Sequence, residues 1–198
     1  MNSNRKIILA SQSKSRKSVL EQLGLSFMVH ESHYEEDMTL NKTPEELAKF
    51  LSLGKAKNVA TSYTNAIIIA GDTFIVYKNK IIGKPKNEKD AIQMLQNFSG
   101  KSIKVVSGLA IIDTKNNKIV NDYGVGFVNF RKLNKKEIKM YAKTKESLRS
   151  AGAFAVAGLG AILIDSIKGD LYAINTIPLV KLYLGLQKLG INLLKNKR

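Results

Sequence analysis

The sequence predicts an α/β fold, with a mixed, twisted sheet and flanking helices, from three observations. Short apolar runs typical of buried strands alternate with segments whose apolar residues recur at helical spacing. Two pairs of strand-like runs are separated only by short polar turns, which indicates hairpins and therefore antiparallel neighbours in the sheet. The 198 residues, 44% of them hydrophobic, are enough for one domain or two tightly joined lobes.

Strands and helices alternate over the first 70 residues. Residues 7–10 form an apolar run that predicts a buried strand, followed by a helix that ends at Gly24 and a short strand over 26–29. Thr43-Pro44-Glu45-Glu46 is a capping box with proline at the first helical position, so a helix should run from about 44 to 61. Residues 67–70 predict a second fully apolar strand.

Turn signals organise the middle of the chain. Gly71-Asp72-Thr73 is expected to stop the second apolar strand, and Lys78-Asn79 is typical of a hairpin turn between short strands. A helix should start at Asn87 and end before Gly100. Two long β-branched runs, residues 105–112 and 119–130, predict antiparallel strands around a turn.

The last third returns to helices. Asn134 to Tyr141 predicts a short helix with Glu137 at the capping-box position. A segment rich in glycine and alanine, residues 151–161, precedes a strand over 162–167. Pro178 should open the final helix, which carries one apolar stripe made of Leu179, Leu182, Leu186 and Leu189.

The residue types that are missing exclude several classes of protein. Cysteine is absent, so disulfides, thiolate metal sites and a cysteine nucleophile are excluded, and only His30 and His33 offer imidazole. No apolar run reaches the roughly 18 to 20 residues that span a bilayer. The first residues lack the apolar region of a signal peptide, so we expect a cytoplasmic protein without a membrane partner.

The net charge of +16 raises the question of a nucleic-acid partner. Only five of the 32 basic residues are arginine, and the lysines are spread along the whole chain. Since arginine is the better reader of phosphates and bases, this pattern favours a solvated lysine surface over a nucleic-acid face. The same positive field would also attract a small anionic substrate.

One anion site is predicted at a strand-to-helix turn. Ser11, Ser13 and Arg16 combine hydroxyls, free backbone N–H groups and a cation at a helix start, which suits a phosphate. The plain alternative is that Ser13 only caps the helix and Arg16 lies in solvent. Lys84, fixed between Gly83 and Pro85, is a second phosphate candidate, although a surface turn explains it equally well.

Acidic residues supply the other candidates. Asp72 follows an apolar strand, where an aspartate can hold a divalent ion or activate water, but it also fits an ordinary turn. Glu35-Glu36-Asp37 is an acidic cluster in a basic chain. It can complete a magnesium site with phosphate oxygens and water, or it can be a solvated loop.

In order, these segments resemble the Maf family over nearly the whole chain. The resemblance rests on Ile8-Leu9-Ala10-Ser11-Gln12-Ser13 with Arg16, Leu20 to Gly24, Glu35-Glu36, Lys55-Ala56, Asp72-Thr73, Gly83-Lys84-Pro85, Ser99-Gly100, Val105-Val106-Ser107-Gly108, Phe130-Arg131, Ala151-Gly152-Ala153-Phe154, Gly158-Leu159-Gly160 and Gly169-Asp170. Each piece alone is weak, whereas the ordered set is specific.

The resemblance implies one Maf-like domain over residues 1–198, with an inosine-triphosphatase-like fold, two lobes around a central cleft, and often a homodimer. It implies hydrolysis of the α–β phosphoanhydride of a nucleoside triphosphate with magnesium or manganese. Asp72 would then be the catalytic base and, with Glu36, would hold the metal. The phosphates would be bound by Ser11, Ser13, Arg16, Lys55 and Lys84.

The chain departs from the family pattern at three places. Ser15-Arg16 stands where the family usually has two arginines, and Ala70-Gly71 precedes Asp72 where Gly-Ala is usual. Ala157 replaces the glutamine of a dTTP/UTP-preferring branch or the glutamate of a 7-methyl-GTP branch, and alanine cannot read a base edge. The lost arginine and glutamine keep one alternative open, a non-catalytic nucleotide-binding relative that affects cell division. The net charge keeps another open, a basic nucleic-acid-binding module.

Overall fold

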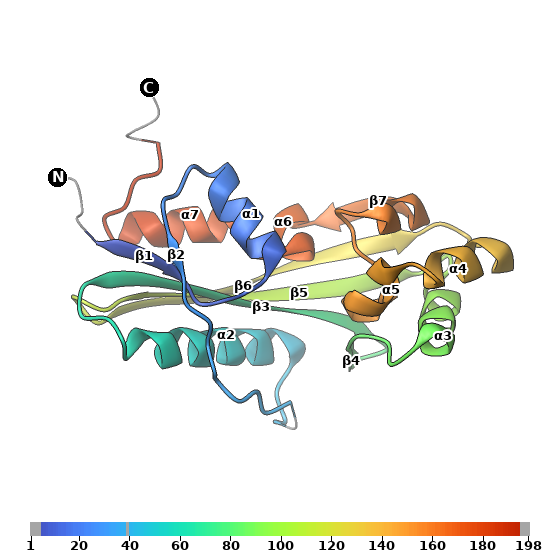
Figure 1. Ribbon diagram of the computed structural model, residues 1–198, viewed down its shortest axis with the longest axis horizontal. Helices are drawn as coiled ribbons and strands as arrows, with labels where there is room; N and C mark the ends of the chain where they lie inside the picture. Colours follow the sequence, from blue (N-terminus) through green and yellow to red (C-terminus); the bar gives the residue numbers. More distant parts are fainter. Residues whose placement is uncertain (1–4, 39, 195–198) are drawn as a thin grey trace. The chain divides into compact units, whose positions relative to one another are not determined.

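The computed structural model describes residues 5–38 and 40–194 of the chain (Figure 1). Its strands are β1 (Lys6–Leu9), β2 (Met28–Val29), β3 (Ala66–Tyr77), β4 (Lys80–Ile82), β5 (Ser102–Asp113), β6 (Lys118–Phe130) and β7 (Ile164–Gly169). The α-helices are α1 (Lys14–Gln22), α2 (Pro44–Ala60), α3 (Glu88–Phe98), α4 (Lys135–Ala142), α5 (Lys145–Arg149), α6 (Leu171–Asn175) and α7 (Leu179–Lys188). Two short 3₁₀ turns cover Ala151–Ala153 and Leu159–Leu163.

The strands form one mixed sheet, which confirms the predicted α/β class. Their order is β2-β1-β3-β5-β6-β7, with β4 paired to β3. β1 runs parallel to both β2 and β3, whereas the pairs β3–β4 and β6–β7 are antiparallel. The apolar residues 7–9 of β1 therefore lie between two parallel neighbours, and Ile8 and Leu9 are fully buried, as the sequence predicts.

The chain divides into two compact units. Unit 1 comprises residues 1–73, 107–124 and 176–198, and unit 2 comprises residues 74–106 and 125–175. Three of the four boundaries between the units fall inside strands β3, β5 and β6, and the fourth lies between α6 and α7.

Unit 1 has a layer of helices on each face of its strands (Figure 1). Alternate residues of β1 and β3 explain this, because successive side chains point to opposite faces of a sheet. Leu9, Ile67 and Ile69 pack with Leu20 of α1 and with the leucine stripe of α7. Ile8 and Ile68 pack on the other face, against Ala56 and Val59 of α2.

Unit 2 has its own aromatic core beside α3 and α4. Phe98, Phe130 and Phe154 lie with ring centroids 4.8–6.2 Å apart, two of the three pairs edge to face. Leu95 of α3 and Ile138 of α4 belong to the same buried cluster. Residues far apart in sequence thus share one core, which makes the second unit compact in its own right.

The predicted caps are confirmed. Thr43 accepts a hydrogen bond from the Glu46 N–H and the Glu46 carboxylate accepts one from the Thr43 N–H, which completes the capping box of α2. Asn134 and Glu137 form the same box on α4. Asn87 caps α3.

The prediction that Gly71-Asp72-Thr73 stops a strand is wrong. β3 continues without a break from Ala66 to Tyr77, so Asp72 lies inside a strand and not on a turn. Glycine is needed at position 71 because its neighbours leave no room for a side chain. An added Cβ would lie 2.6 Å from Ile177 Cγ2 and 3.0 Å from Gly108 O. The strand predicted over 26–29 is also shorter, and the sequence patterns missed the short helices α5 and α6.

Candidate active site

The start of α1 places two serines and an arginine together in unit 1. Ser13 is the N-cap, and its hydroxyl accepts a hydrogen bond from the Arg16 N–H at 3.4 Å. The Ser11 hydroxyl accepts from the Ser13 N–H at 3.2 Å and from Arg16 Nη1 at 3.1 Å. The hydroxyls and the cation of the predicted anion site therefore converge at one helix start.

Arg16 does not lie in solvent, so the plain alternative for this residue is wrong. Its Nη1 donates to Ser11 and its Nη2 donates to Thr73 Oγ1 at 3.1 Å, while its buried Nε has no partner among the described residues. Burial lowers the pKa of Arg16, and the nearby carboxylates of Asp72 and Glu36 oppose that shift. A guanidinium held only by hydroxyls keeps its charge available for an anion.

A lysine and two carboxylates form the second half of the site. Lys55 Nζ, from α2, lies 2.6 Å from Glu36 Oε1 and 3.2 Å from Asp72 Oδ1. The Lys55 and Asp72 side chains are only 16% and 13% exposed, whereas that of Glu36 is 41% exposed. The structure thus brings together three predicted site residues that are up to 36 positions apart in sequence.

The two oxygens of Asp72 differ in their surroundings. Oδ1 accepts from Lys55 Nζ and from the Thr73 N–H at 3.0 Å. Oδ2 is buried and has no hydrogen-bond partner in the part of the chain that the structure describes. Burial raises the pKa of Asp72 above its ordinary value of 3.8, with Glu36 adding to the rise and Lys55 and Arg16 opposing it.

These carboxylates fit a magnesium or manganese ion that is shared with a substrate. Magnesium is commonly held by one or two carboxylates, with waters and substrate phosphates as its remaining ligands. Asp72 Oδ2 is a buried carboxylate oxygen without a partner, and Glu36 approaches the same lysine. Within the described residues, no group of three or more histidine, cysteine, aspartate or glutamate side chains is placed to hold a metal without such help.

Lys84 and Ala157 belong to unit 2 and are exposed, Lys84 just after β4 and Ala157 before the second 3₁₀ turn. The cluster described above belongs to unit 1, and the roles of Lys84 and Ala157 stay predictions.

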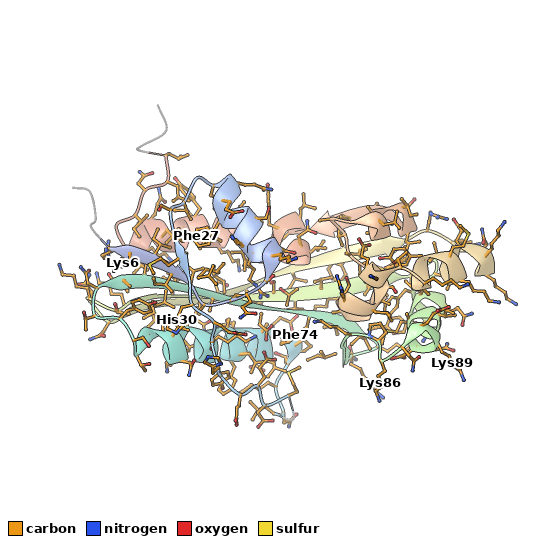
Figure 2. All side chains as sticks on the ribbon, in the orientation of Figure 1. Lys6, Phe27, His30, Phe74, Lys86 and Lys89 are labelled. Carbon is orange, nitrogen blue, oxygen red and sulfur yellow. The ribbon has the colours of Figure 1, made fainter. Side chains whose placement is uncertain are left out.

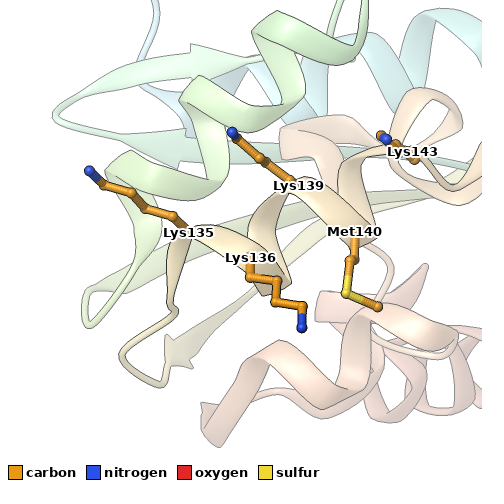
Figure 3. Close-up of a pocket in the computed structure, with 5 residues that line it drawn as sticks. All are labelled: Lys135, Lys136, Lys139, Met140 and Lys143. Carbon is orange, nitrogen blue, oxygen red and sulfur yellow. The ribbon is translucent and has the colours of Figure 1, made fainter.

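The structure also has a surface hollow in each unit that is lined by residues outside the predicted site. The hollow in unit 2 has a volume of about 390 Å³ (Figure 3). It is lined by Met140, by three lysines of α4 (Lys135, Lys136 and Lys139) and by Lys143, which follows α4. The other, of about 470 Å³, lies along α2 beside Tyr34 and Phe50. None of the predicted site residues lines either hollow. Other lysines, such as Lys6, Lys86 and Lys89, are exposed and point outward (Figure 2).

Three residues beside the site had no role in the sequence-based prediction. In the sequence, Thr73 and Ser107 occur only as parts of longer motifs, and Thr176 belongs to none of them. Ser107 and Thr176 are 0% and 2% exposed. For Ser107, the signal in the sequence is a lone hydroxyl inside a run of buried apolar residues.

Comparison with known proteins identifies the relatives of this chain. The family model described as "Maf-like protein" matches residues 6–189. The dTTP/UTP pyrophosphatase of Methanococcoides burtonii is 40% identical over 96% of this chain and 97% of its own. Those of Desulforamulus reducens and Lachnoclostridium phytofermentans are 40% and 41% identical over 96% of this chain and 99% and 98% of their own. Among solved structures, the Ham1 protein of Staphylococcus aureus matches 64% of this chain and 72% of that chain, with a TM-score of 0.44 and 14% identity.

Proposed function

Because this chain belongs to the Maf family, we propose that it is a nucleoside triphosphate pyrophosphatase that cuts the α–β phosphoanhydride of dTTP, UTP or a related nucleotide. The products are a nucleoside monophosphate and pyrophosphate. The observation that carries this proposal is the cluster in unit 1, in which Asp72 shares Lys55 with Glu36. Curated relatives that this chain covers almost completely are named for that substrate pair.

In this proposal Asp72 is the general base. Its unpartnered Oδ2 takes a proton from water as the water oxygen attacks the α-phosphorus, and the bond from that phosphorus to the bridging oxygen breaks. Lys55 holds the other carboxylate oxygen, which fixes the direction of Oδ2. The raised pKa of Asp72 makes the carboxylate a stronger base than an exposed aspartate.

The cations and hydroxyls of unit 1 bind the phosphates. Arg16, with Ser11 and Ser13, offers N–H and O–H donors at the start of α1, where the helix dipole also favours negative charge. Phosphoryl transfer is mainly a matter of positioning and charge stabilisation, so fixed donors serve it well. By its resemblance to the family pattern, we also assign Lys84 to phosphate binding.

Glu36 and Asp72 would hold a magnesium or manganese ion. When bound, the ion would polarise phosphate oxygens and offset their charge. Chelation with EDTA should abolish turnover, and added Mg²⁺ or Mn²⁺ should restore it. Full turnover in excess EDTA would remove the metal from the proposal.

We further propose a single Maf-like domain over residues 1–198, its two units acting as two lobes, a homodimer, and a cytoplasmic location, where nucleoside triphosphates are made. No helix in the described part of the chain is long and apolar enough to cross a membrane. Light scattering coupled to size-exclusion chromatography tests the dimer: the expected mass is twice the 21.9 kDa of one chain.

The test of the function is a pyrophosphate-release screen with dTTP, UTP, CTP and 7-methyl-GTP, each with Mg²⁺ or Mn²⁺. The expected products are the monophosphate and pyrophosphate in equal amounts. Nucleoside diphosphate and orthophosphate as primary products would show attack at a different phosphorus. Binding of a triphosphate without any product would favour the non-catalytic alternative.

A further inference from the structure

A network of hydroxyls and backbone carbonyls holds the Nη2 end of the Arg16 guanidinium. Arg16 Nη2 donates to Thr73 Oγ1 at 3.1 Å, and Thr73 Oγ1 lies 2.7 Å from Ser107 Oγ and 2.9 Å from the Thr176 carbonyl oxygen. Ser107 Oγ lies 2.7 Å from that carbonyl and 3.2 Å from the Asp72 carbonyl oxygen. The network joins β3, β5 and the segment before α7.

The chemistry of the guanidinium fixes the direction of one hydrogen bond at Thr73. A guanidinium only donates, so Thr73 Oγ1 accepts from Arg16 and must give its own hydrogen to Ser107 or to the Thr176 carbonyl. A carbonyl oxygen has two lone pairs and can accept from both hydroxyls. The lone pair of Thr73 Oγ1 that faces Arg16 is therefore held in place by the Ser107 hydroxyl of β5 and by the Thr176 carbonyl.

Because its partners are hydroxyls, the Arg16 guanidinium keeps a positive charge that carboxylate partners would neutralise. A carboxylate on the guanidinium would neutralise the charge that a phosphate needs, whereas a hydroxyl fixes its orientation and leaves the charge intact. Asp72 and Glu36 act on Arg16 through space, and its hydrogen-bonded partners among the described residues are hydroxyls. The Nε of Arg16 is also buried and has no hydrogen-bond partner among the described residues.

We infer that Thr73 and Ser107, anchored on the Thr176 carbonyl, are positioning residues that orient Arg16 toward the phosphates of the substrate. This inference rests on the proposed function, because it gives Arg16 a phosphate to bind. It adds to that function a set of residues that act through Arg16 and do not touch the reacting atoms themselves.

The test is a double-mutant cycle between residues 73 and 16, with kcat/KM for pyrophosphate release from dTTP and UTP as the readout. Thr73→Val keeps the shape and removes the hydroxyl, so kcat/KM should fall about 10- to 100-fold, the effect of losing one hydrogen bond to a charged group. Thr73→Ser keeps the hydroxyl and should stay within about threefold of the wild type. In an Arg16→Ala background, Thr73→Val should cause less than about a threefold further loss.

Thr114→Val is the matched control. The Thr114 hydroxyl also bonds to buried backbone, namely the N–H and carbonyl of Ala66, but it has no contact with Arg16. This variant should lose stability and keep kcat/KM. Ser107→Ala repeats the cycle if Thr73→Val does not fold, with the same expected pattern.

The outcomes separate the two claims. Two results would overturn the positioning role and leave the proposed pyrophosphatase function intact. One is that Thr73→Val lowers kcat/KM as much in the Arg16→Ala background as in the wild type. The other is that Thr73→Val does not lower kcat/KM in the wild-type background. A wild-type protein that releases no pyrophosphate from any triphosphate would instead overturn the proposed function and, with it, the inference.

Discussion

Asp72 is a single residue whose two carboxylate oxygens have different partners, and its replacement tests the chemistry most directly. Asp72→Asn keeps the shape, but the amide cannot take a proton from water and carries no charge for a metal. Turnover should fall at least about 100-fold while the fold is retained. Asp165→Asn is the matched control, because Asp165 is exposed in unit 2 and outside the cluster. Near-normal turnover in Asp72→Asn would mean that another group activates the water.

Ala157 is the position at which we expect this chain to differ from the family pattern in its preference among nucleobases. Alanine has no hydrogen-bonding group, so the chain should tolerate several bases, since an apolar contact discriminates only about 10- to 200-fold. Ala157→Gln should sharpen the ratios of kcat/KM among dTTP, UTP, CTP and 7-methyl-GTP and leave pyrophosphate binding unchanged. Ala161→Gln, at another exposed alanine of unit 2, is the control. Wild-type discrimination above about 1000-fold would place base recognition elsewhere.

At the scale of elements, the contact between α2 and β5 depends on Gly108. A Cβ added there would lie 2.0 Å from Ala48 O and 2.4 Å from Ala48 C, which are backbone atoms that cannot rotate away. Gly108→Ala should therefore lower the free energy of unfolding by about 2–3 kcal/mol, as overpacking in a core does. Chemical denaturation checks this. Gly83→Ala, whose Cβ meets nothing within 4 Å, should change stability by less than about 1 kcal/mol.

Glu146 of α5 holds the second 3₁₀ turn. Its carboxylate accepts hydrogen bonds from the Tyr141 hydroxyl at 2.7 Å and from the N–H groups of Leu159 and Gly160 at 3.0 and 2.7 Å. Desolvation raises the pKa of Glu146, but these hydrogen bonds outweigh it, so the pKa lies below the ordinary 4.5. Burial and the bond to Glu146 raise the pKa of Tyr141, which stays protonated and remains a donor.

The sign of this shift gives a dependence of stability on pH. A carboxylate whose pKa is lower in the folded state stabilises above its unfolded pKa and loses that effect as pH falls through the folded value. Glu146→Gln should lower the free energy of unfolding by about 1 kcal/mol at pH 7 and by less at pH 3. Glu21→Gln, in an exposed ion pair with Lys17, is the control and should change stability by less than about 0.5 kcal/mol. An equal loss from Glu146→Gln at both pH values would contradict this account.

At the scale of the molecule, the dominant property is the net charge of +16. A positive field raises the rate at which an anionic substrate arrives, and salt screens it, since the Debye length falls from about 10 Å at 0.1 M to about 3 Å at 1 M. The kcat/KM for dTTP should therefore fall about 3- to 10-fold between 20 and 500 mM KCl, with kcat almost unchanged. A kcat/KM that is independent of salt would show that the positive charge of the lysines does not speed the arrival of the substrate.

The lysines of α4 offer a variant for the same measurement. Replacing Lys135, Lys136, Lys139 and Lys143 with glutamine lowers the net charge from +16 to +12, because four positive charges are removed. The salt dependence should become shallower. A DNA duplex at 10 μM should not inhibit dTTP turnover at 150 mM salt. Strong inhibition would support the nucleic-acid-binding alternative.

Local signals in the sequence were sufficient for most of the elements. The capping boxes at Thr43 and Asn134, the turn at Lys78-Asn79 and the apolar runs of β1 and β3 depend on interactions between residues at most four apart or on alternation along one strand. The order of the motifs also identified the family. These properties can be read without the fold because each depends on neighbours along the chain or on the order of motifs in the sequence.

The arrangement of the site was decided only by the tertiary structure. The sequence predicts a turn at Asp72, but β3 continues through it, and burial of the side chain raises the pKa of Asp72. Lys55 lies between Asp72 and Glu36 because α2 packs on β3, and Arg16 meets Thr73, 57 positions away, because α1 packs on the other face. Burial makes isolated charges costly, so each must find partners in space, and those partners come from segments whose spacing along the chain carries no signal.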